Sequence, residues 1–277
     1  MTCHNRRALT TRCLESLKRQ ATGAIIDAYL VDDGCTDGTA EAATAVWPGI
    51  RIVEGNGCLF WNGGMRLAWE VAAASGQYDF FLWLNDDVVL DADAVARLLS
   101  DAARLVDAGG AVIVAGSTRQ PGTDTITYGG QRRVTPRRPL RFELVDPGPA
   151  PVAADTFSGN VVLVSATSFA RLGNLLPDFI HIFGDLDYGL RARTAGIPVF
   201  AGSGVHGTCE GAAVAGSSLD LRLSRRQRLA RRVREERKIH ARDWRVFVRR
   251  HSGLGPLRAL YLLAPYVRIL RTASVSI

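Results

Sequence analysis

The chain has 277 residues, of which 47% are hydrophobic, and a formal net charge of +7, so it is globular material able to build a sizeable core rather than a disordered or fibrous chain. Its five cysteines are odd in number and contain no Cys-x-x-Cys pair, which argues against a disulfide scaffold or a zinc site and fits a reducing cytoplasm. No signal peptide and no apolar run of membrane-spanning length is visible.

Helices and strands are expected to alternate over the first part of the chain. Apolar spacing predicts helices over residues 10–20, 39–46, 63–75 and 92–107. Short apolar runs predict strands over residues 28–31, 50–53, 79–84 and 111–115. This alternation predicts an α/β protein with a parallel, doubly wound sheet.

The alternation stops after residue 115. Glycine and arginine pairs and a proline-rich stretch between residues 117 and 155 indicate an irregular, hairpin-bearing insertion. A strand over 161–164 and a short helix over 168–172 follow, and a Gly/Ala/Ser-rich link runs from His206 to residue 218. The pattern then predicts a long arginine-rich helix over about 219–250 and a last helical piece. We therefore expect a body over residues 1–210 and a basic, amphipathic helical tail over 219–277.

The start of the chain does not fit the expected sheet. The first strand of a doubly wound sheet usually lies near the centre, yet Met1–Asn5 holds no apolar run. We therefore expect the first strand to be truncated and the natural protein to carry further apolar residues upstream of Met1. The intact mass of the endogenous protein tests this expectation.

Two acidic side chains follow the apolar strand 80–84 directly, in Asn85-Asp86-Asp87. The carboxyl end of such a strand lies at the edge where α/β sheets bind ligands. Unpaired buried acids are costly, so a cation or hydrogen-bond donors should meet them, and carboxylate oxygens suit Mg²⁺ or Mn²⁺. The alternative is a plain strand-to-helix turn in which Asp91 or Asp93 caps the next helix.

Further polar groups follow other predicted strands. Asp32, at the end of strand 28–31, could accept hydrogen bonds from a nucleobase or ribose, although capping of helix 39–46 is the alternative for this turn. Asp185 could begin a helix and take a proton from a hydroxyl, or it could be a helix cap beside an Asp187–Arg191 pair. A lone histidine such as His206 is more often structural than a ligand, but three acidic loops at one edge favour a metal role for it.

Four motifs in this order resemble the family 2 glycosyltransferases of the GT-A fold, and rhamnosyltransferase-like bacterial members in particular. The motifs are Thr2–Asn5, Val31–Thr39, Asn85–Asp87 and Gly184–Arg191, and the resemblance covers about residues 2–210. It implies a Rossmann-like, doubly wound, mostly parallel sheet. It also implies a nucleotide-diphosphosugar donor such as a UDP- or dTDP-sugar, a divalent cation (Mn²⁺ or Mg²⁺) and inversion at the anomeric carbon.

The resemblance also assigns roles to individual residues. On the donor side, Thr2 and Asp32 would contact the nucleoside, Asp86 would lie near the ribose or the metal, and Asn56 belongs to a stretch that resembles a donor-side loop. The sequence contains no Walker motif and no Gly-x-Gly-x-x-Gly motif, and Gly55-Asn56-Gly57 is too short to count as a phosphate loop by itself.

For the reaction itself, Asp87 would bind the metal, His206 would complete the metal site and Asp185 would be the general base. Two positions depart from the family pattern. Gly184 stands where an acid usually precedes the catalytic aspartate, and Arg66 stands where many relatives have asparagine.

The charge is concentrated in the tail. Residues 206–277 hold sixteen Lys/Arg against five Asp/Glu, whereas residues 1–205 hold eighteen against twenty-two. A basic segment followed by an amphipathic one indicates an interfacial anchor on an anionic membrane, and helices packed on the body are an equally open alternative. Nucleic-acid binding ranks lowest, because no aromatic platform or recognised motif accompanies the charge.

The resemblance, together with the acidic loops, implies an inverting, metal-assisted glycosyltransferase. It would act in cell-envelope polysaccharide synthesis on a glycan or lipid-linked hydroxyl, in the cytoplasm or peripherally at the inner face of the plasma membrane. One alternative is a sugar nucleotidyltransferase, whose glycine-rich basic loop is not supplied by Thr2–Arg7. The other is a catalytically inactive GT-A membrane or assembly module, suggested by Gly184 and the short start of the chain.

Overall fold

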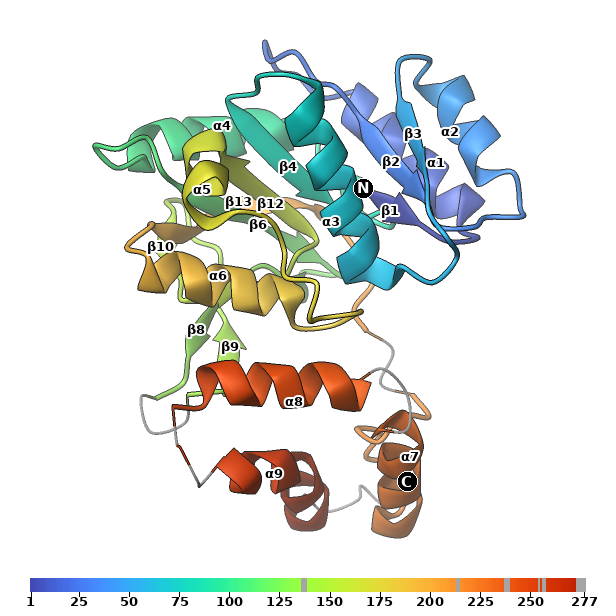
Figure 1. Cartoon of the computed structure of the whole chain (residues 1–277), viewed down its shortest axis with the longest axis vertical. Helices are drawn as coiled ribbons and strands as arrows, with labels where there is room; N and C mark the ends of the chain where they lie inside the picture. Colours follow the sequence, from blue (N-terminus) through green and yellow to red (C-terminus); the bar gives the residue numbers. More distant parts are fainter. Residues whose placement is uncertain (136–138, 213–214, 237–239, 254, 256–257, 273–277) are drawn as a thin grey trace.

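The structure is a computed structural model that describes residues 1–135, 139–212, 215–236, 240–253, 255 and 258–272. Its body is built of sheets covered by helices, and three further helices lie at the opposite end of the molecule (Figure 1).

The first sheet is small and fully parallel. Its strands lie in the order β1 (Thr2–Cys3), β2 (Tyr29–Asp32) and β3 (Arg51–Glu54). They are joined through α1 (Arg7–Lys18) and α2 (Thr39–Val46). The start of the chain thus forms a two-residue strand, in which Thr2 lies opposite Val31.

The second sheet is mixed. Its main path runs β10 (Val152–Ala153), β13 (Val199–Thr208), β6 (Ile113–Arg119), β12 (Val161–Ser165) and β4 (Phe80–Leu84). The short strands β5 (Val89–Leu90) and β7 (Ile126–Tyr128) pair with β13 and β6. A third sheet, β11 (Thr156–Phe157), β8 (Gly130–Arg133) and β9 (Phe142–Leu144), forms the predicted hairpin-bearing insertion.

The expectation of a mostly parallel sheet is only partly met. The first sheet and the β6–β13 pair are parallel, but β12 runs antiparallel to both β4 and β6. The physical reason lies in the connection, because parallel neighbours need a long crossover whereas antiparallel ones do not. The insertion between β6 and β12 holds strands and turns among its described residues, with no crossover helix, and it returns the chain in the antiparallel direction.

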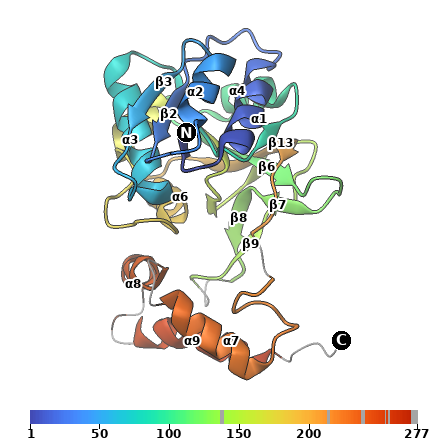
Figure 2. The ribbon, with the colours of Figure 1, turned by 90° about the vertical axis from the view of Figure 1, so that its right-hand side faces the viewer.

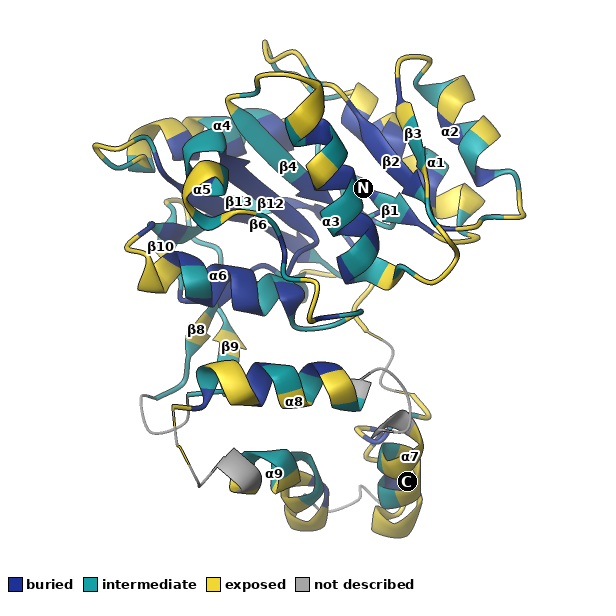
Figure 3. Ribbon diagram, viewed as in Figure 1, coloured by how far each residue is buried: buried dark blue, intermediate teal, exposed yellow. Residues whose placement is uncertain are grey.

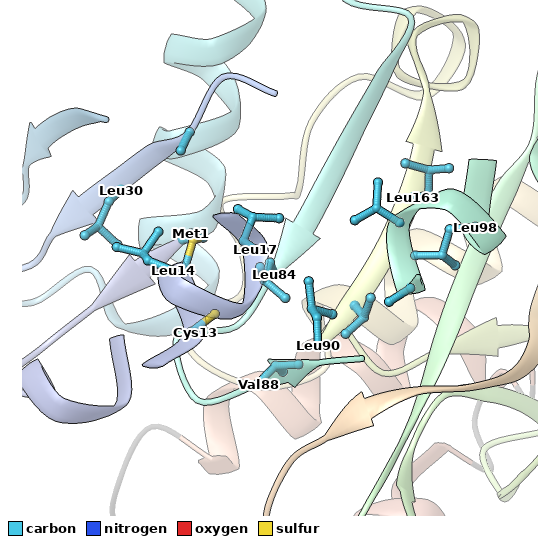
Figure 4. Close-up of a cluster of buried hydrophobic side chains, with 14 of the residues drawn as sticks. Met1, Cys13, Leu14, Leu17, Leu30, Leu84, Val88, Leu90, Leu98 and Leu163 are labelled. Atoms are coloured by element: carbon cyan, nitrogen blue, oxygen red, sulfur yellow. The ribbon is translucent and has the colours of Figure 1, made fainter. Parts of the chain in front are cut away.

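The helices of the body are α3 (Phe60–Ser75), α4 (Ala94–Leu105), α5 (Ala166–Leu172) and α6 (Gly184–Thr194). Strands β6 and β12 are buried along almost their whole length, as the dark strands in Figure 3 show. One apolar cluster, drawn in Figure 4, joins α1, β2, the end of β4 and α4 through side chains such as Leu14, Leu30, Leu84 and Leu98.

An aromatic cluster on the other side of β4 completes the core. The rings of Trp69 and Trp83 lie 5.0 Å apart, and those of Trp83 and Tyr188 lie 5.2 Å apart. The cluster joins α3, β4 and α6. The carboxyl end of β4 is therefore held between two apolar clusters, which fixes the position of the acidic turn that follows it.

The tail forms α7 (Arg225–Glu236), α8 (His240–His251) and α9 (Arg258–Arg271), which contact one another below the body (Figure 2). The single helix expected over 219–250 is thus two helices, and the junction at 237–239 lies outside the described residues. Within the described ranges, no helix has both the length and the hydropathy needed to span a membrane.

Helix α8 packs on the body. Asp243 accepts hydrogen bonds from the backbone N–H groups of Ile180, His181 and Ile182 at 2.8–3.0 Å. The ring of Phe247 stacks on Phe183 with a centroid distance of 4.9 Å. The packed alternative therefore holds for α8, which lies against the loop that leads into α6.

Candidate active site

An arginine side chain binds both carboxylates of the acidic turn after β4. Arg6, at the amino end of α1, donates one terminal nitrogen to Asp86 Oδ1 at 2.9 Å and the other to Asp87 Oδ2 at 2.8 Å. The Asp86 side chain is 5% exposed and that of Asp87 25%. Burial raises the pKa of Asp86 to about 6, although the Arg6 guanidinium acts to lower it. Two adjacent carboxylates in so little water require a positive partner, and Arg6 supplies one.

Asn85 ties the acidic turn to its neighbours. Its backbone N–H donates to the carbonyl of Asn160, just before β12, at 2.9 Å, and its side-chain oxygen accepts the Trp61 indole N–H at 2.7 Å. Asn160 in turn donates to the Cys209 sulfur, whose S–H donates to Asp87 Oδ1 at 3.4 Å. Asn85, for which the motif itself suggests no role, therefore fixes the turn that presents Asp86 and Asp87.

Asp185 lies in the first turn of α6. Its two carboxylate oxygens accept the backbone N–H groups of Gly159 and Leu186, each at 2.8 Å. Burial raises its pKa to about 6 despite these hydrogen bonds. A Cβ at Gly159 would clash with the ring of Trp61, so glycine is needed for this close approach. Trp61 therefore connects the surroundings of Asp185 with the acidic turn after β4.

Gly184 has a steric explanation. A Cβ at this position would overlap Oδ1 of Asn62, a fully buried residue of α3. The amide nitrogen of Asn62 donates to the carbonyls of Leu176 and Phe179 at 2.9 and 2.8 Å, which holds the side chain in place. The space next to Gly184 is therefore filled by the side chain of Asn62.

The loop after β3, which is predicted to lie on the donor side, is held by Asp33, an acid to which the motifs assign no role. Asp33 accepts the backbone N–H groups of Gly57, Leu59 and Phe60 at 2.8–3.1 Å. Asp32 turns instead toward its own loop and accepts the Cys35 N–H at 2.7 Å. Asp33 follows β2 directly, and its contact with residues 57–60 joins segments that are distant in the chain, so no local pattern indicates it.

Two other predicted donor residues lie in the same region. Asn56 is exposed in the loop after β3, and its side-chain oxygen accepts the Cys58 N–H at 2.9 Å. Thr2 is half-buried against Gly64 of α3, where a Cβ would overlap the threonine hydroxyl. The structure therefore brings Thr2, Asp32 and Asn56 to the part of the body formed by β1, β2, β3 and the start of α3.

His206 is not brought to the acidic turn. Its ring is fully buried beside Gly116 and Gly202, and its Nδ1 accepts the Ser117 N–H at 3.3 Å. Burial, together with nearby Arg97, lowers its pKa to about 4, so the ring is neutral. The charged groups that act on the ring are Arg97 and Asp101 of α4 and Asp93 just before it. The side chain that lies at Asp87 is Cys209, which the sequence did not indicate as a site residue.

The acidic turn fits a divalent cation only in part. Asp86 and Asp87 already hold a cationic group between them, and carboxylate oxygens are suitable ligands for Mg²⁺ or Mn²⁺. Within the described parts of the chain, no group of three His, Cys, Asp or Glu side chains is placed to hold a metal. A metal at this turn would need its remaining ligands from phosphate oxygens or water.

Comparison with family models gives one match. The model described as Glycosyl transferase family 2 matches residues 1–166, which is more than half of the chain.

Curated relatives of similar sequence come from Mycobacterium tuberculosis strains CDC 1551 / Oshkosh and ATCC 25618 / H37Rv. Both are named N-acetylglucosaminyl-diphospho-decaprenol L-rhamnosyltransferase and are 29% identical to this chain over 199 residues. The match covers 64% of this chain and 64% of each relative, so it spans less than two thirds of their length.

Solved structures share the fold at low sequence identity. The crystal structure of S. aureus TarS matches with a TM-score of 0.50 and 14% identity, over 76% of this chain and 35% of that one. The crystal structure of GalNAc-T7 with UDP, GalNAc and Mn²⁺ matches with a TM-score of 0.54 and 13% identity, over 73% of this chain and 41% of that one.

Proposed function

Because the chain belongs to glycosyltransferase family 2, we propose that it moves a sugar from a nucleotide-diphosphosugar to an acceptor hydroxyl, with inversion at the anomeric carbon. The observation that carries the proposal is the environment of Asp185. This carboxylate begins a helix, is held by two backbone N–H groups and has a pKa raised to about 6. Such a group is ionised at neutral pH yet basic enough to accept a proton.

Asp185 is the general base in this proposal. It accepts the proton of the acceptor hydroxyl while that oxygen attacks the anomeric carbon from the face opposite the leaving diphosphate. The hydrogen bonds from Gly159 and Leu186 orient the carboxylate before the acceptor arrives, so little reorganisation is needed during the reaction.

Asp87 and Asp86 would hold a divalent cation, Mn²⁺ or Mg²⁺, which would offset the charge that develops on the diphosphate. The Mn²⁺ named in the GalNAc-T7 structure supports this choice by analogy of fold. His206 is left out of the proposed ligand set because its ring is buried beside Gly116 and Gly202, where its Nδ1 accepts the Ser117 N–H. Thr2, Asp32 and Asn56 are the proposed contacts of the nucleotide, in a loop that Asp33 keeps in shape.

The acceptor is proposed to be a glycan or a lipid-linked glycan of cell-envelope polysaccharide synthesis. The name of the mycobacterial relatives, which specifies a diphospho-decaprenol and rhamnose, supports a lipid-linked acceptor. The donor is proposed to be a UDP- or dTDP-sugar, and UDP is named in the GalNAc-T7 structure. We place the protein in the cytoplasm or at the inner face of the membrane, since such donors are made there and α9 exposes an apolar face.

An inactive module is the less supported alternative. Of its two grounds, Gly184 and the short start of the chain, the first is weakened, because Asn62 fills the space next to this glycine and Asp185 keeps its place in the first helical turn. A sugar nucleotidyltransferase is likewise less supported, because the family match identifies a transferase of sugars.

Substitution of Asp185 by asparagine tests the proposal. Purified protein is screened by thermal shift for UDP-, dTDP- and GDP-sugars with Mn²⁺, and transfer or donor hydrolysis is measured with the donor that binds. Asp185→Asn keeps the shape of the side chain and removes its basicity, so turnover should fall by about 10²–10⁴-fold with donor binding unchanged. Asp124→Asn, in an exposed turn, is the matched control. Full turnover in Asp185→Asn would remove this residue from the role of base.

A further inference from the structure

Arg6 forms ion pairs with two carboxylates although its side chain is 40% exposed. The preceding Asn5 has a left-handed φ of 51°, and its side-chain oxygen accepts the Thr36 N–H at 2.7 Å. This anchored turn directs Arg6 from the amino end of α1 to the acidic turn after β4. Its two terminal nitrogens then bind different carboxylates, one on Asp86 and one on Asp87.

Every oxygen of the two carboxylates has a donor. Asp86 Oδ1 and Asp87 Oδ2 accept from Arg6, Asp86 Oδ2 lies 3.5 Å from the Thr10 hydroxyl, and Asp87 Oδ1 lies 3.4 Å from the Cys209 thiol. The thiol and hydroxyl contacts are long and neutral, so the guanidinium is the main compensation for two negative charges.

A divalent cation at this pair would compete with the guanidinium. Arg6 holds one oxygen of each carboxylate, so a metal would either take those two oxygens or bind the other two beside a positive group that repels it. Arg6 can leave without disturbing the core, because its side chain is partly in solvent and its charge is easily hydrated there.

We propose that Arg6 is an internal counter-cation of Asp86 and Asp87, with which a divalent metal must compete when it binds. This inference rests on the proposed function, since it concerns the metal of that reaction. Arg6 is then a positioning residue with two effects. It keeps the carboxylate pair in place in the metal-free protein, and it lowers the affinity of that protein for metal.

Metal binding without any donor sugar tests the inference. Free Mn²⁺ is titrated by electron paramagnetic resonance against the full chain, the Arg6→Ala variant and the Arg7→Ala variant. Arg7 is the matched control, because it is the next residue, has the same charge and is exposed. We expect Arg6→Ala to bind Mn²⁺ at least about tenfold more tightly than the unchanged chain, a gain of about 1.4 kcal/mol. Arg7→Ala should bind as the unchanged chain does.

Thermal unfolding gives a second readout. Loss of Arg6 leaves a buried carboxylate without its partner, so Arg6→Ala should have a lower Tm than the unchanged chain without metal. Mn²⁺ should raise the Tm of the variant more than that of the unchanged chain, and an added Asp87→Ala substitution should abolish this response. If Arg6→Ala fails to fold, Arg6→Gln, which removes the positive charge and keeps a shorter polar side chain, is measured in its place.

Unchanged or weaker Mn²⁺ binding after loss of Arg6 would overturn the inference and leave Arg6 as an ordinary structural ion pair. That result would not touch the proposed function, which is tested by sugar transfer and by Asp185→Asn. Conversely, absence of any transfer with tight Mn²⁺ binding in Arg6→Ala would contradict the function and leave the inference standing.

Discussion

Two opposing effects set the pKa of Asp185. Burial in the first turn of α6 raises its pKa, while the N–H groups of Gly159 and Leu186 favour the ionised form and limit the rise to about 6. A more exposed aspartate would be a weaker base, and a buried one without donors would be protonated at neutral pH. The position of Gly159 against Trp61 makes this balance possible.

The raised pKa predicts an acid limb in the rate profile. Below a pH of about 6 the fraction of ionised Asp185 falls, so kcat/KM should drop about tenfold per pH unit, and it should level off above about 7. The measurement is kcat/KM against pH at saturating metal, with circular dichroism at each pH to show that the fold persists. A flat profile down to a pH of about 5 would contradict the assignment of Asp185 as base.

The sequence indicated the acids of the site better than their neighbours. Asp86, Asp87 and Asp185 lie in motifs that can be recognised from the sequence alone. In the structure, Asp86 and Asp87 both form ion pairs with Arg6. Asp33 and Cys209 could not be found in that way. Each acts through a contact between segments distant in the chain, Asp33 with the loop at 57–60 and Cys209 with Asp87.

At the scale of elements, α8 acts as a support for the start of α6. Asp243 caps three successive N–H groups just before Phe183, and the Asp187 carboxylate accepts from Arg191, Arg250 and His251, each at 2.8 Å. Although burial raises the pKa of Asp187, these partners hold it below its ordinary value. The loop that presents Asp185 is thus held from both sides.

Removal of the Asp243 carboxylate should loosen this support. Asp243→Ala leaves the N–H groups of residues 180–182 without their acceptor, so the free energy of unfolding should fall by about 2 kcal/mol. Turnover should fall as well, because the loop leads directly to Asp185. Urea unfolding and turnover are measured beside Asp124→Ala, whose carboxylate is exposed; equal values in the two variants would show that α8 does not support the loop.

Local patterns predicted most elements of the body. The helix expected over 39–46 is α2, and the strand expected over 79–84 is β4 within one residue. The direction of β12 and the separation of α7 from α8 could not be derived from periodicity. The direction of β12 depends on the path of the insertion before it, and the position of α8 depends on its contact with Phe183. Both are contacts between segments that are distant in the chain.

At the scale of the whole molecule, α9 carries an unusual surface. Leu260, Leu263, Val267 and Leu270 are all exposed, and their spacing places them on one face of the helix. Arg268 and Arg271 are exposed on the same helix, and α7, which contacts α9, is rich in arginine. Exposed leucines beside arginines suit the surface of an anionic membrane.

We therefore expect the full chain to sediment with liposomes that contain anionic lipid and much less with neutral ones. A Leu263→Ser/Leu270→Ser variant should lose most of this binding and retain transfer to a water-soluble acceptor. Ile25→Ser is the matched control, because Ile25 is 96% exposed but lies on the body. Equal sedimentation of all three proteins would assign α9 another role.

The contacts of α8 with the body limit where the tail of this chain can be exchanged for that of a related one. A boundary near residue 210 separates the two regions by charge, but an exchange of tails at that point would remove Asp243, Arg250 and His251 from their partners in the body. A working chimera must therefore inherit α8 together with the segment from Ile180 to Arg191, as a single block.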